Sequence, residues 1–165
     1  MTNTLARQDI TQAEQRIHAL FLHAQQYLGQ TFTLPRLTWR KSGKIAGTAN
    51  LTTNVINLNR VLYVHNRQAF LEDVIPHEVS HLIVHQCFGR VKPHGSEWQY
   101  VMEQVFGVPA TTTHQFDLSP LKLNTITYYC GCGPVELGIR RHNKVKRGEQ
   151  SYRCRRCDQT LTLAE

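Results

Sequence analysis

Apolar residues recur every three or four positions from residue 9 to residue 28, which is the spacing of one buried face of an α-helix. Asp9 is placed to cap the start of this helix, and Gly29 is placed to end it. In residues 34–40, apolar and polar residues alternate around Leu37 and Trp39. Residues 44–58 contain two short β-prone runs, separated by the polar pair Thr53-Asn54. The pattern therefore predicts a helix followed by a strand and a hairpin.

The helical spacing returns between residues 66 and 86, with Asn66 as the expected cap. Pro76 lies inside this segment and removes one amide donor, so we expect a kink or a restart of the helix there. A further helix is predicted over residues 96–106, ended by Gly107. The middle of the chain is therefore expected to be mainly helical.

The character of the sequence changes after Pro120, where short strand-like pieces and paired cysteines replace the helical spacing. We place a boundary near Asn124 and expect two domains, residues 1–124 and residues 125–165. A chain of 165 residues with 41% hydrophobic content is long enough to bury an apolar core. The fold class expected from these elements is α+β.

The sequence offers no sign of a membrane or a secretory segment. Its apolar runs are shorter than the roughly 20 residues that a membrane-spanning helix needs. Charged side chains within residues 1–30 interrupt any secretory apolar region. We therefore expect a cytoplasmic, monomeric protein with no membrane partner.

The segment His77-Glu78-Val79-Ser80-His81 lies inside the second predicted helix. Residues four apart on a helix share one face and lie about 6 Å apart along its axis, so both imidazoles can reach one metal ion. The carboxylate of Glu78 then lies beside the ion without binding it, where it can take a proton from a water molecule. The motif predicts a catalytic zinc site with His77 and His81 as ligands and Glu78 as catalytic base.

A catalytic zinc ion usually has three protein ligands and one open position. His85 cannot share an ion with His77, because the span along the helix would be about 12 Å. Cys87 stands where a longer zinc-protease motif has its third histidine, but the rest of that motif is not matched. His94 is favoured, because its loop can turn the ring back toward the ion, and Glu103 on the next helix is the alternative.

Four of the five cysteines form two close pairs near the end of the chain, Cys130 with Cys132 and Cys154 with Cys157. Two such pairs separated by about twenty residues are typical of a zinc ribbon. Zinc is favoured over disulfides in a cytosolic protein. The first pair has one intervening residue rather than two, so His142 is an alternative ligand. The sequence thus predicts two zinc ions, one catalytic and one structural.

The net charge of +7 is concentrated in the C-terminal region. Residues 140–156 contain eight basic residues and a single acidic residue, Glu149. Such a cluster predicts sequence-nonspecific DNA binding through phosphates, and a solvated basic face is the alternative. The predicted DNA contacts are Arg140, Arg141, Lys144, Lys146, Arg147, Arg153, Arg155 and Arg156.

Three features together resemble the bacterial SprT family: residues 76–82 around the paired histidines, the Pro93-His94-Gly95-x-x-Trp98 element, and the terminal cysteines. The resemblance also takes in residues 47–49 and 57–59, and so covers nearly the whole chain. That family is related to Spartan-type proteases, which degrade proteins crosslinked to DNA. The resemblance implies a zincin-like helical domain with a small β-sheet, followed by a small β zinc ribbon. It also implies a DNA-bound protein substrate, with Glu78 as base and His77, His81 and His94 as ligands.

Two classes of function are consistent with these observations. The first is a zinc metalloprotease acting on DNA-associated or DNA-crosslinked proteins, with a peptide added along the hairpin of residues 45–58. The second is a nucleic-acid-binding zinc protein whose histidine site is inactive or structural. Glu78 favours the first, because a structural zinc site has no use for a carboxylate there. Tyr100 and His114 are possible oxyanion donors, although a structural role is favoured for each.

Overall fold

The computed structural model describes residues 5–114, 116–121 and 123–163. The chain forms two compact units, Met1–Leu121 and Lys122–Glu165, so the division falls a few residues before Asn124. Each unit has its own cluster of buried apolar side chains. The units combine helices with small sheets, which confirms the α+β class. Within the described ranges, none of the helices has both the length and the apolar character that crossing a bilayer requires.

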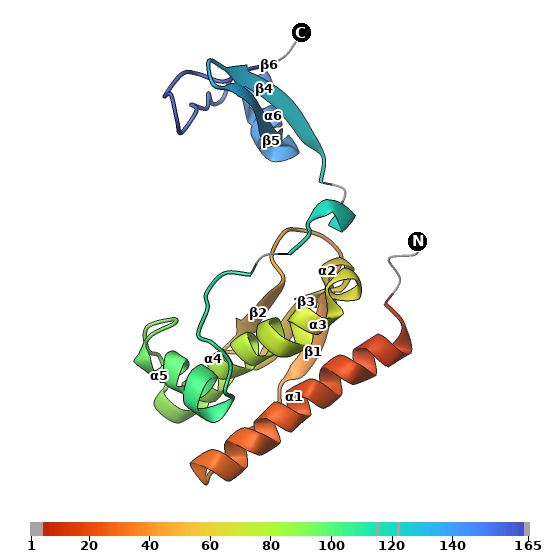
Figure 1. Ribbon diagram of the computed structural model, residues 1–165, viewed down its shortest axis with the longest axis vertical. Helices are drawn as coiled ribbons and strands as arrows, with labels where there is room; N and C mark the ends of the chain where they lie inside the picture. The colour runs from red at the N-terminus through yellow and green to blue at the C-terminus, as the bar shows by residue number, and fades with distance from the viewer. Residues whose placement is uncertain (1–4, 115, 122, 164–165) are drawn as a thin grey trace. The chain divides into compact units, whose positions relative to one another are not determined.

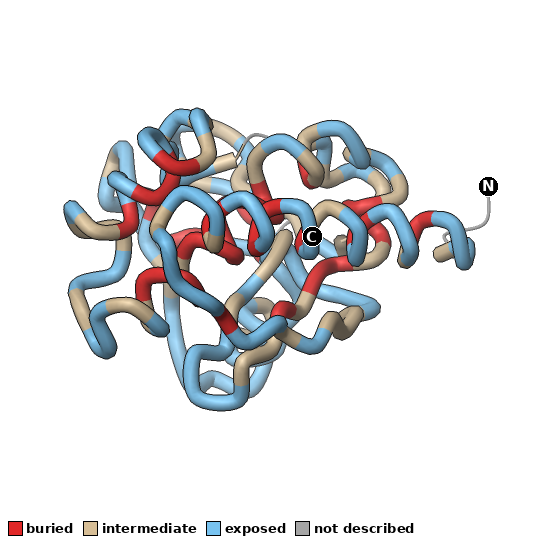
Figure 2. The backbone as a smooth tube through the Cα atoms, turned by 90° about the horizontal axis from the view of Figure 1, so that it is seen from below, coloured by how far each residue is buried: buried red, intermediate tan, exposed pale blue. Residues whose placement is uncertain are grey.

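The first unit begins with the 22-residue helix α1 (Arg7–Leu28), which ends at the left-handed residue Gly29, as predicted. Its buried positions recur turn by turn along one side (Figure 2). The predicted role of Asp9 as the cap residue itself is wrong, because Ala6 is the N-cap. The carboxylate of Asp9 instead accepts a hydrogen bond from the Ala6 amide at 3.0 Å, and it also pairs with Arg67.

The sheet of the first unit contains β1 (Arg36–Arg40), β2 (Gly47–Asn50) and β3 (Val55–Asn59) in the order β1-β3-β2. β2 and β3 form the predicted antiparallel hairpin, and β1 pairs with β3 in parallel. β2 therefore lies at an edge of the sheet, and its outer side pairs with no strand among the described residues.

A chain of helical segments follows the sheet. Asn59 caps its first helix by accepting hydrogen bonds from the amides of Val61 and Leu62. Asn66 occupies the predicted N-cap position of the next helix, but its side chain makes no capping hydrogen bond and donates to the Leu62 carbonyl at 3.0 Å instead. The segments are α2 (Arg60–His65), α3 (Arg67–Ala69), the π-helical turn η1 (Phe70–Val74) and α4 (Ile75–Phe88).

The irregularity expected at Pro76 takes the form of the π turn directly before it. There the Ile75 amide donates to the Phe70 carbonyl, five residues back. In this register residue 76 would donate to the Leu71 carbonyl, but proline has no amide hydrogen. The Leu71 carbonyl instead accepts from Nε of Arg16 in α1 at 2.9 Å. Pro76 therefore lies in the first turn of α4, where a missing donor is tolerated.

α4 is the central element of the first unit, since it contacts α1, β2 and the last helices of that unit (Figure 1). Those last helices are α5 (Ser96–Tyr100) and the π turn η2 (Val101–Val105), followed by Gly107 in a left-handed conformation. The unit ends with the 3-10 turn η3 (Ser119–Leu121). The side chains predicted to face inward from this segment are buried, namely Trp98, Val101, Met102 and Val105.

The second unit is a three-stranded antiparallel sheet with one helix. The strands β4 (Thr125–Cys130), β5 (Gly133–Gly138) and β6 (Thr162–Leu163) lie in the order β5-β4-β6. The helix α6 (Ile139–Lys146) was not predicted, because it is largely polar and buries none of its residues. The buried residues described in this unit are few: Tyr128, Leu137, Cys154 and Leu161.

Candidate functional site

Three histidines meet at one point of the first unit. His77 and His81 lie one turn apart on α4, and His94 lies in the loop before α5. The Nε2 atoms are separated by 3.2 Å (His77 to His81), 3.1 Å (His81 to His94) and 3.0 Å (His77 to His94). Three nitrogens bound to one tetrahedral zinc ion lie roughly 3.3 Å apart. The structure thus brings together the three predicted ligands in an arrangement that fits one zinc ion.

The backbone at His94 explains how a loop aims this ring back at α4. His94 adopts a left-handed conformation with φ of 56°, which is uncommon for a residue with a side chain. The following amide, of Gly95, donates to the Lys92 carbonyl at 3.0 Å and closes the turn. Nε2 of Gln99 donates to the His94 carbonyl at 3.2 Å and holds the peptide from the other side. The turn therefore fixes the direction of the His94 imidazole.

The indole ring of Trp98 packs against all three imidazoles. Its ring centroid lies 4.8 Å from that of His77, 5.7 Å from that of His81 and 4.7 Å from that of His94. The indole is 1% exposed, and its Nε1 donates to the His77 carbonyl at 3.3 Å. The spacing of apolar residues predicts only that Trp98 faces inward, and this role in the metal site was missed. The signal was its position four residues after His94.

Two histidines of the triad, His77 and His81, are uncharged near neutral pH. Burial, reinforced by the neighbouring imidazoles, lowers the pKa of His77 to about 3. Burial and the adjacent His94 lower the pKa of His81 to about 4. A metal ion binds the neutral form of imidazole, so these residues need lose no proton to bind one.

Glu78 lies beside the triad in the first turn of α4 and is 8% exposed. Burial raises its pKa to about 7, while the Ala49 amide and the charge of Arg40 act in the opposite direction. Gly47 makes room for this carboxylate: a Cβ atom there would lie 3.1 Å from Cγ and 3.2 Å from Oε1 of Glu78. The edge strand β2 and the carboxyl group are therefore in direct contact.

The peptidase activity expected from the sequence should fall about tenfold in kcat when Gly47 is replaced with alanine, because the added methyl group displaces the Glu78 carboxylate. The same methyl group would also lie 3.0 Å from Val74. Zinc content should be unchanged, since the triad is not touched. Gly138→Ala is the control, because no atom lies within 4 Å of its Cβ position. Unchanged kcat in Gly47→Ala would show that the contact is not needed.

The alternative ligands considered for the first site lie elsewhere. Glu103 is exposed on η2, and it is not part of the metal-binding cluster found among the described residues. Cys87 is half-buried and accepts a hydrogen bond from Gln30 at 2.8 Å. His85 lies one turn beyond His81 and is also outside the cluster.

Replacing His94 with alanine is expected to lower the zinc content of the full chain by about one ion, because two imidazoles alone hold zinc weakly. Glu103→Ala is the matched control and should keep its zinc. Elemental analysis of the purified proteins makes the comparison. The reverse result, with zinc lost in Glu103→Ala alone, would transfer the third ligand to Glu103.

The two possible oxyanion donors are placed differently. Tyr100 is 43% exposed, and its hydroxyl interacts with that of Tyr27. The ring of His114 lies 5.5 Å from that of His77, and burial lowers the pKa of His114. Of the two residues, His114 is therefore the one whose ring lies against the triad.

The sulfur atoms of Cys130, Cys132, Cys154 and Cys157 lie within 4.8 Å of one another. Cys130 ends β4 opposite Gly133 of β5, so Cys132 lies in a two-residue hairpin turn. This tight turn is the reason that one intervening residue is sufficient in the first pair. The structure thus gathers the four predicted thiol ligands at one point.

Backbone amides favour the thiolate form of Cys154 at this second site. The amides of Cys157 and Arg156 are the main reason that the pKa of Cys154 is lowered to about 6. The Arg156 amide lies 3.4 Å from the Cys154 sulfur. His142 is not a ligand in this arrangement, because its Nδ1 pairs with the Tyr128 hydroxyl at 3.1 Å. A four-thiolate site fits a structural zinc ion.

Gln159 packs directly over Gly131 in the turn that carries the first cysteine pair. The Gly131 amide donates to Oε1 of Gln159 at 2.6 Å, and a Cβ atom on Gly131 would lie 2.6 Å from the same oxygen.

All eight basic residues predicted to contact DNA are exposed. Arg147 and Arg153 among them are paired with Glu149 and Asp158 at 2.5 and 2.9 Å. The remaining six are Arg140, Arg141, Lys144, Lys146, Arg155 and Arg156.

The fold and the two clusters define a chain with a histidine-based metal-site unit and a zinc ribbon. A model of the SprT-like family matches residues 17–114, and a model of the SprT-like zinc ribbon domain matches residues 124–165. The chain therefore belongs to the SprT-like family.

Curated relatives agree with this assignment. Protein SprT of Vibrio atlanticus is 51% identical over 140 residues, which are 85% of this chain and 84% of the relative. Protein SprT of Shewanella oneidensis is 47% identical over 150 residues, 91% of this chain and 96% of the relative. Protein SprT of Escherichia fergusonii is 50% identical over 135 residues, 82% of each chain.

Proposed function

We propose that this protein is a zinc-dependent metallopeptidase that hydrolyses proteins associated with or crosslinked to DNA. The observation that carries the proposal is the buried carboxylate of Glu78 beside three converging imidazoles. His77, His81 and His94 would hold the catalytic zinc ion, and the four ribbon cysteines would hold a structural one. A zinc ion bound by three histidines lowers the pKa of water and polarises a carbonyl group.

Glu78 is the residue assigned to proton transfer. Its carboxylate accepts a proton from the attacking water and delivers it to the leaving amine. A raised pKa suits this role, because a base with a pKa near the working pH can both take and release the proton. The close contact with Gly47 keeps the carboxylate in one position.

The edge strand β2 is the proposed binding site for the substrate peptide. A peptide in extended conformation adds to such an edge through main-chain hydrogen bonds. The binding therefore depends on the backbone of the substrate more than on its sequence. The contact between Gly47 and Glu78 brings that edge to the catalytic carboxylate.

The ribbon is the proposed DNA-binding unit. Six exposed basic side chains on α6 and around Cys154 form no ion pair with any residue that the structure describes, and they suit contacts to phosphates, which carry no sequence information. Tyr152 lies under the guanidinium of Arg141 at 5.5 Å, which places an aromatic ring among the cations. DNA binding would bring the peptidase to its substrates.

The test is digestion of an unfolded protein by the full-length, zinc-loaded chain, with and without single-stranded DNA. We expect cleavage that a chelator stops and added zinc restores, and that DNA increases. The alternative, a DNA-binding zinc protein with an inactive histidine site, is supported instead if the zinc-loaded chain binds DNA but cleaves nothing.

DNA binding is expected to weaken steeply with salt, because phosphate contacts release condensed counterions. About four contacts to single-stranded DNA predict a roughly 50-fold loss of affinity between 50 and 200 mM salt. Reversing the charges of Arg140, Arg141 and Lys144 should weaken binding at least about tenfold. Reversal of the exposed residues Arg7 and Arg36 is the control, and both titrations are followed by fluorescence anisotropy. Equal effects of the two sets would remove the ribbon from DNA binding.

A further inference from the structure

Three basic residues lie together where the chain passes from β1 to the edge strand β2. Arg40 is the last residue of β1, and Lys41 and Lys44 are exposed in the loop that follows. From residue 36 to residue 71 the sequence contains six basic residues and no acidic one, so no acid nearby in the sequence offsets them. Arg40, Lys41 and Lys44 are called the loop cations below.

Arg40 reaches across the sheet to the edge strand. Its Nε donates to Oδ1 of Asn57 in β3 at 2.6 Å, and a terminal nitrogen donates to the Thr48 hydroxyl in β2 at 2.6 Å. Thr48 directly follows Gly47, the residue at which β2 contacts Glu78. Burial raises the pKa of Glu78, and the charge of Arg40 is close enough to oppose that shift. The guanidinium is therefore held beside the histidine site.

A buried asparagine holds the loop in place. Nδ2 of Asn59, which is 0% exposed, donates to the carbonyls of Gly43 and Ile45 at 2.8 and 3.4 Å. Lys44 lies between these two anchored carbonyls. It is three residues before the start of β2, so its Cα lies at most about 11 Å from that of the first residue of the strand. The loop thus presents its lysines from a fixed backbone close to the catalytic carboxylate.

The loop cations have no acidic partner among the described residues. The ion pairs found there involve Arg67, Arg147 and Arg153. Arg40 is half-buried, and its two side-chain hydrogen bonds go to neutral groups. Its charge is therefore partly removed from water without a counter-ion, a situation that an approaching anion would relieve.

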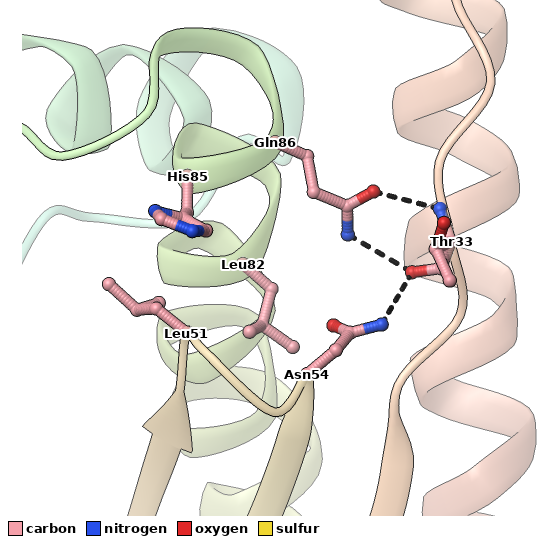
Figure 3. Close-up of a pocket in the computed structure, with 6 residues that line it drawn as sticks. All are labelled: Thr33, Leu51, Asn54, Leu82, His85 and Gln86. Carbon is pink, nitrogen blue, oxygen red and sulfur yellow. Dashed lines mark hydrogen bonds between the residues drawn. The ribbon is translucent and has the colours of Figure 1, made fainter.

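The other end of β2 has a different character. There the Asn54 side chain ties the turn from β2 to β3 to the carbonyls of Thr33 and Leu34, at 3.1 and 3.0 Å (Figure 3). The cavity beside this turn is lined by Thr33, Leu51, Asn54, Leu82, His85 and Gln86. None of these lining residues is a lysine, an arginine or an acid. The positive charge along the edge strand is therefore concentrated at the end that contacts Glu78.

The phosphates of a DNA strand fit this surface. Along one strand a phosphate recurs about every 3.4 Å of helix axis, so consecutive phosphates can meet several cations at once. A guanidinium has five N–H donors, and Arg40 uses two of them within the sheet, which leaves donors for a phosphate. A peptide would need a run of acidic side chains to make the same contacts. Phosphate contacts carry no sequence information, as proposed for the ribbon.

We infer that the loop cations are a second DNA-binding site, located on the first unit, which holds backbone phosphates beside the position of peptide cleavage. The inference rests on the proposed function for the position of the cleaved bond. It adds that the DNA attached to a substrate is held at the edge strand itself. The ribbon cluster includes none of these three residues.

The first test measures DNA binding and needs no proteolysis. The background is full-length, zinc-loaded protein with the ribbon charges reversed, Arg140→Glu, Arg141→Glu and Lys144→Glu. We expect it to retain weak, salt-sensitive binding to a single-stranded oligonucleotide, followed by fluorescence anisotropy. Adding Lys41→Glu and Lys44→Glu should lower the remaining affinity about tenfold. Both lysines are exposed and make no hydrogen bond among the described residues, so the fold is kept.

The matched control adds Arg7→Glu and Arg36→Glu to the same background. These residues are exposed in the first unit, and Arg36 lies at the end of β1 opposite to Arg40. The control should keep the remaining affinity. Equal effects of the two pairs, or no remaining DNA binding in the background, would overturn the inference.

The second test compares one peptide in two forms, free and covalently joined to a single-stranded oligonucleotide. We expect a higher kcat/KM for the joined form, and a roughly tenfold smaller ratio of joined to free in Lys41→Glu with Lys44→Glu. A lower kcat/KM for a free acidic peptide, with DNA affinity unchanged, would instead assign the loop to peptide carboxylates and overturn the inference. If neither form is cleaved, the proposed peptidase function fails, whereas the loss of affinity in the first test still supports the site.

Discussion

Glu78→Gln is expected to lower the kcat of peptide hydrolysis about 10³-fold while the zinc content stays unchanged. Glutamine has nearly the same shape as glutamate, so the packing against Gly47 is kept. The amide cannot accept the proton of the attacking water, so the general-base contribution is lost. Digestion assays and elemental analysis on the same preparation measure both quantities.

Stability gives this substitution a second readout. Burial raises the pKa of Glu78 to about 7, so the folded chain disfavours its charged form. A neutral amide at this position should therefore not lower the melting temperature at neutral pH, and a loss of activity cannot be attributed to unfolding. Glu103→Gln, at an exposed position on η2, should leave both activity and stability unchanged. Full activity in Glu78→Gln would refute the proposed role of the carboxylate.

Cys154→Ser is expected to remove about one zinc ion per chain and to unfold the second unit. The buried residues described in that unit number four, and one of them is Cys154 itself. Such a core is too small to hold a unit of about forty residues without a metal. The amides of β4 and β5 should lose their protection from hydrogen exchange, whereas those of α4 should keep it.

Cys87→Ser is the control for this prediction, because Cys87 belongs to the first unit and lies outside the cysteine cluster. It should retain its zinc and its exchange protection. DNA affinity should fall in Cys154→Ser together with the fold of the ribbon. Protection that survives in β4 and β5 after zinc loss would show that the apolar cluster is sufficient by itself.

Much of the first unit could be predicted, because its helices bury one face and its motifs are local. The periodicity located α1 and the helix that carries His77 and His81, and the spacing of two residues four apart defined half of the metal site. His94 was favoured from its loop, and the structure shows the left-handed backbone that turns it back. Local patterns were sufficient wherever the determining residues were neighbours in sequence.

The features that were missed depend on contacts between distant segments. The parallel pairing of β1 with β3 joins strands separated by the hairpin, which no local pattern specifies. Trp98 showed only an apolar side chain, and its support of three imidazoles becomes evident when α4 and α5 meet. α6 buries no residue, so it leaves no periodic apolar signal. Asn59 and Asn66 both occupy N-cap positions, but only the Asn59 side chain makes capping hydrogen bonds, a difference that residue type alone does not predict.

The hydrogen bond from Arg16 to Leu71 makes α1 part of the scaffold of the histidine site. It gives a donor to the Leu71 carbonyl, which Pro76 cannot supply, six residues before His77. A chain truncated within α1 would therefore carry every residue assigned to chemistry and still lack the anchor that orients the start of the helix bearing them. Fragments designed to isolate the first unit need to begin before Arg16, even though the family match begins at residue 17.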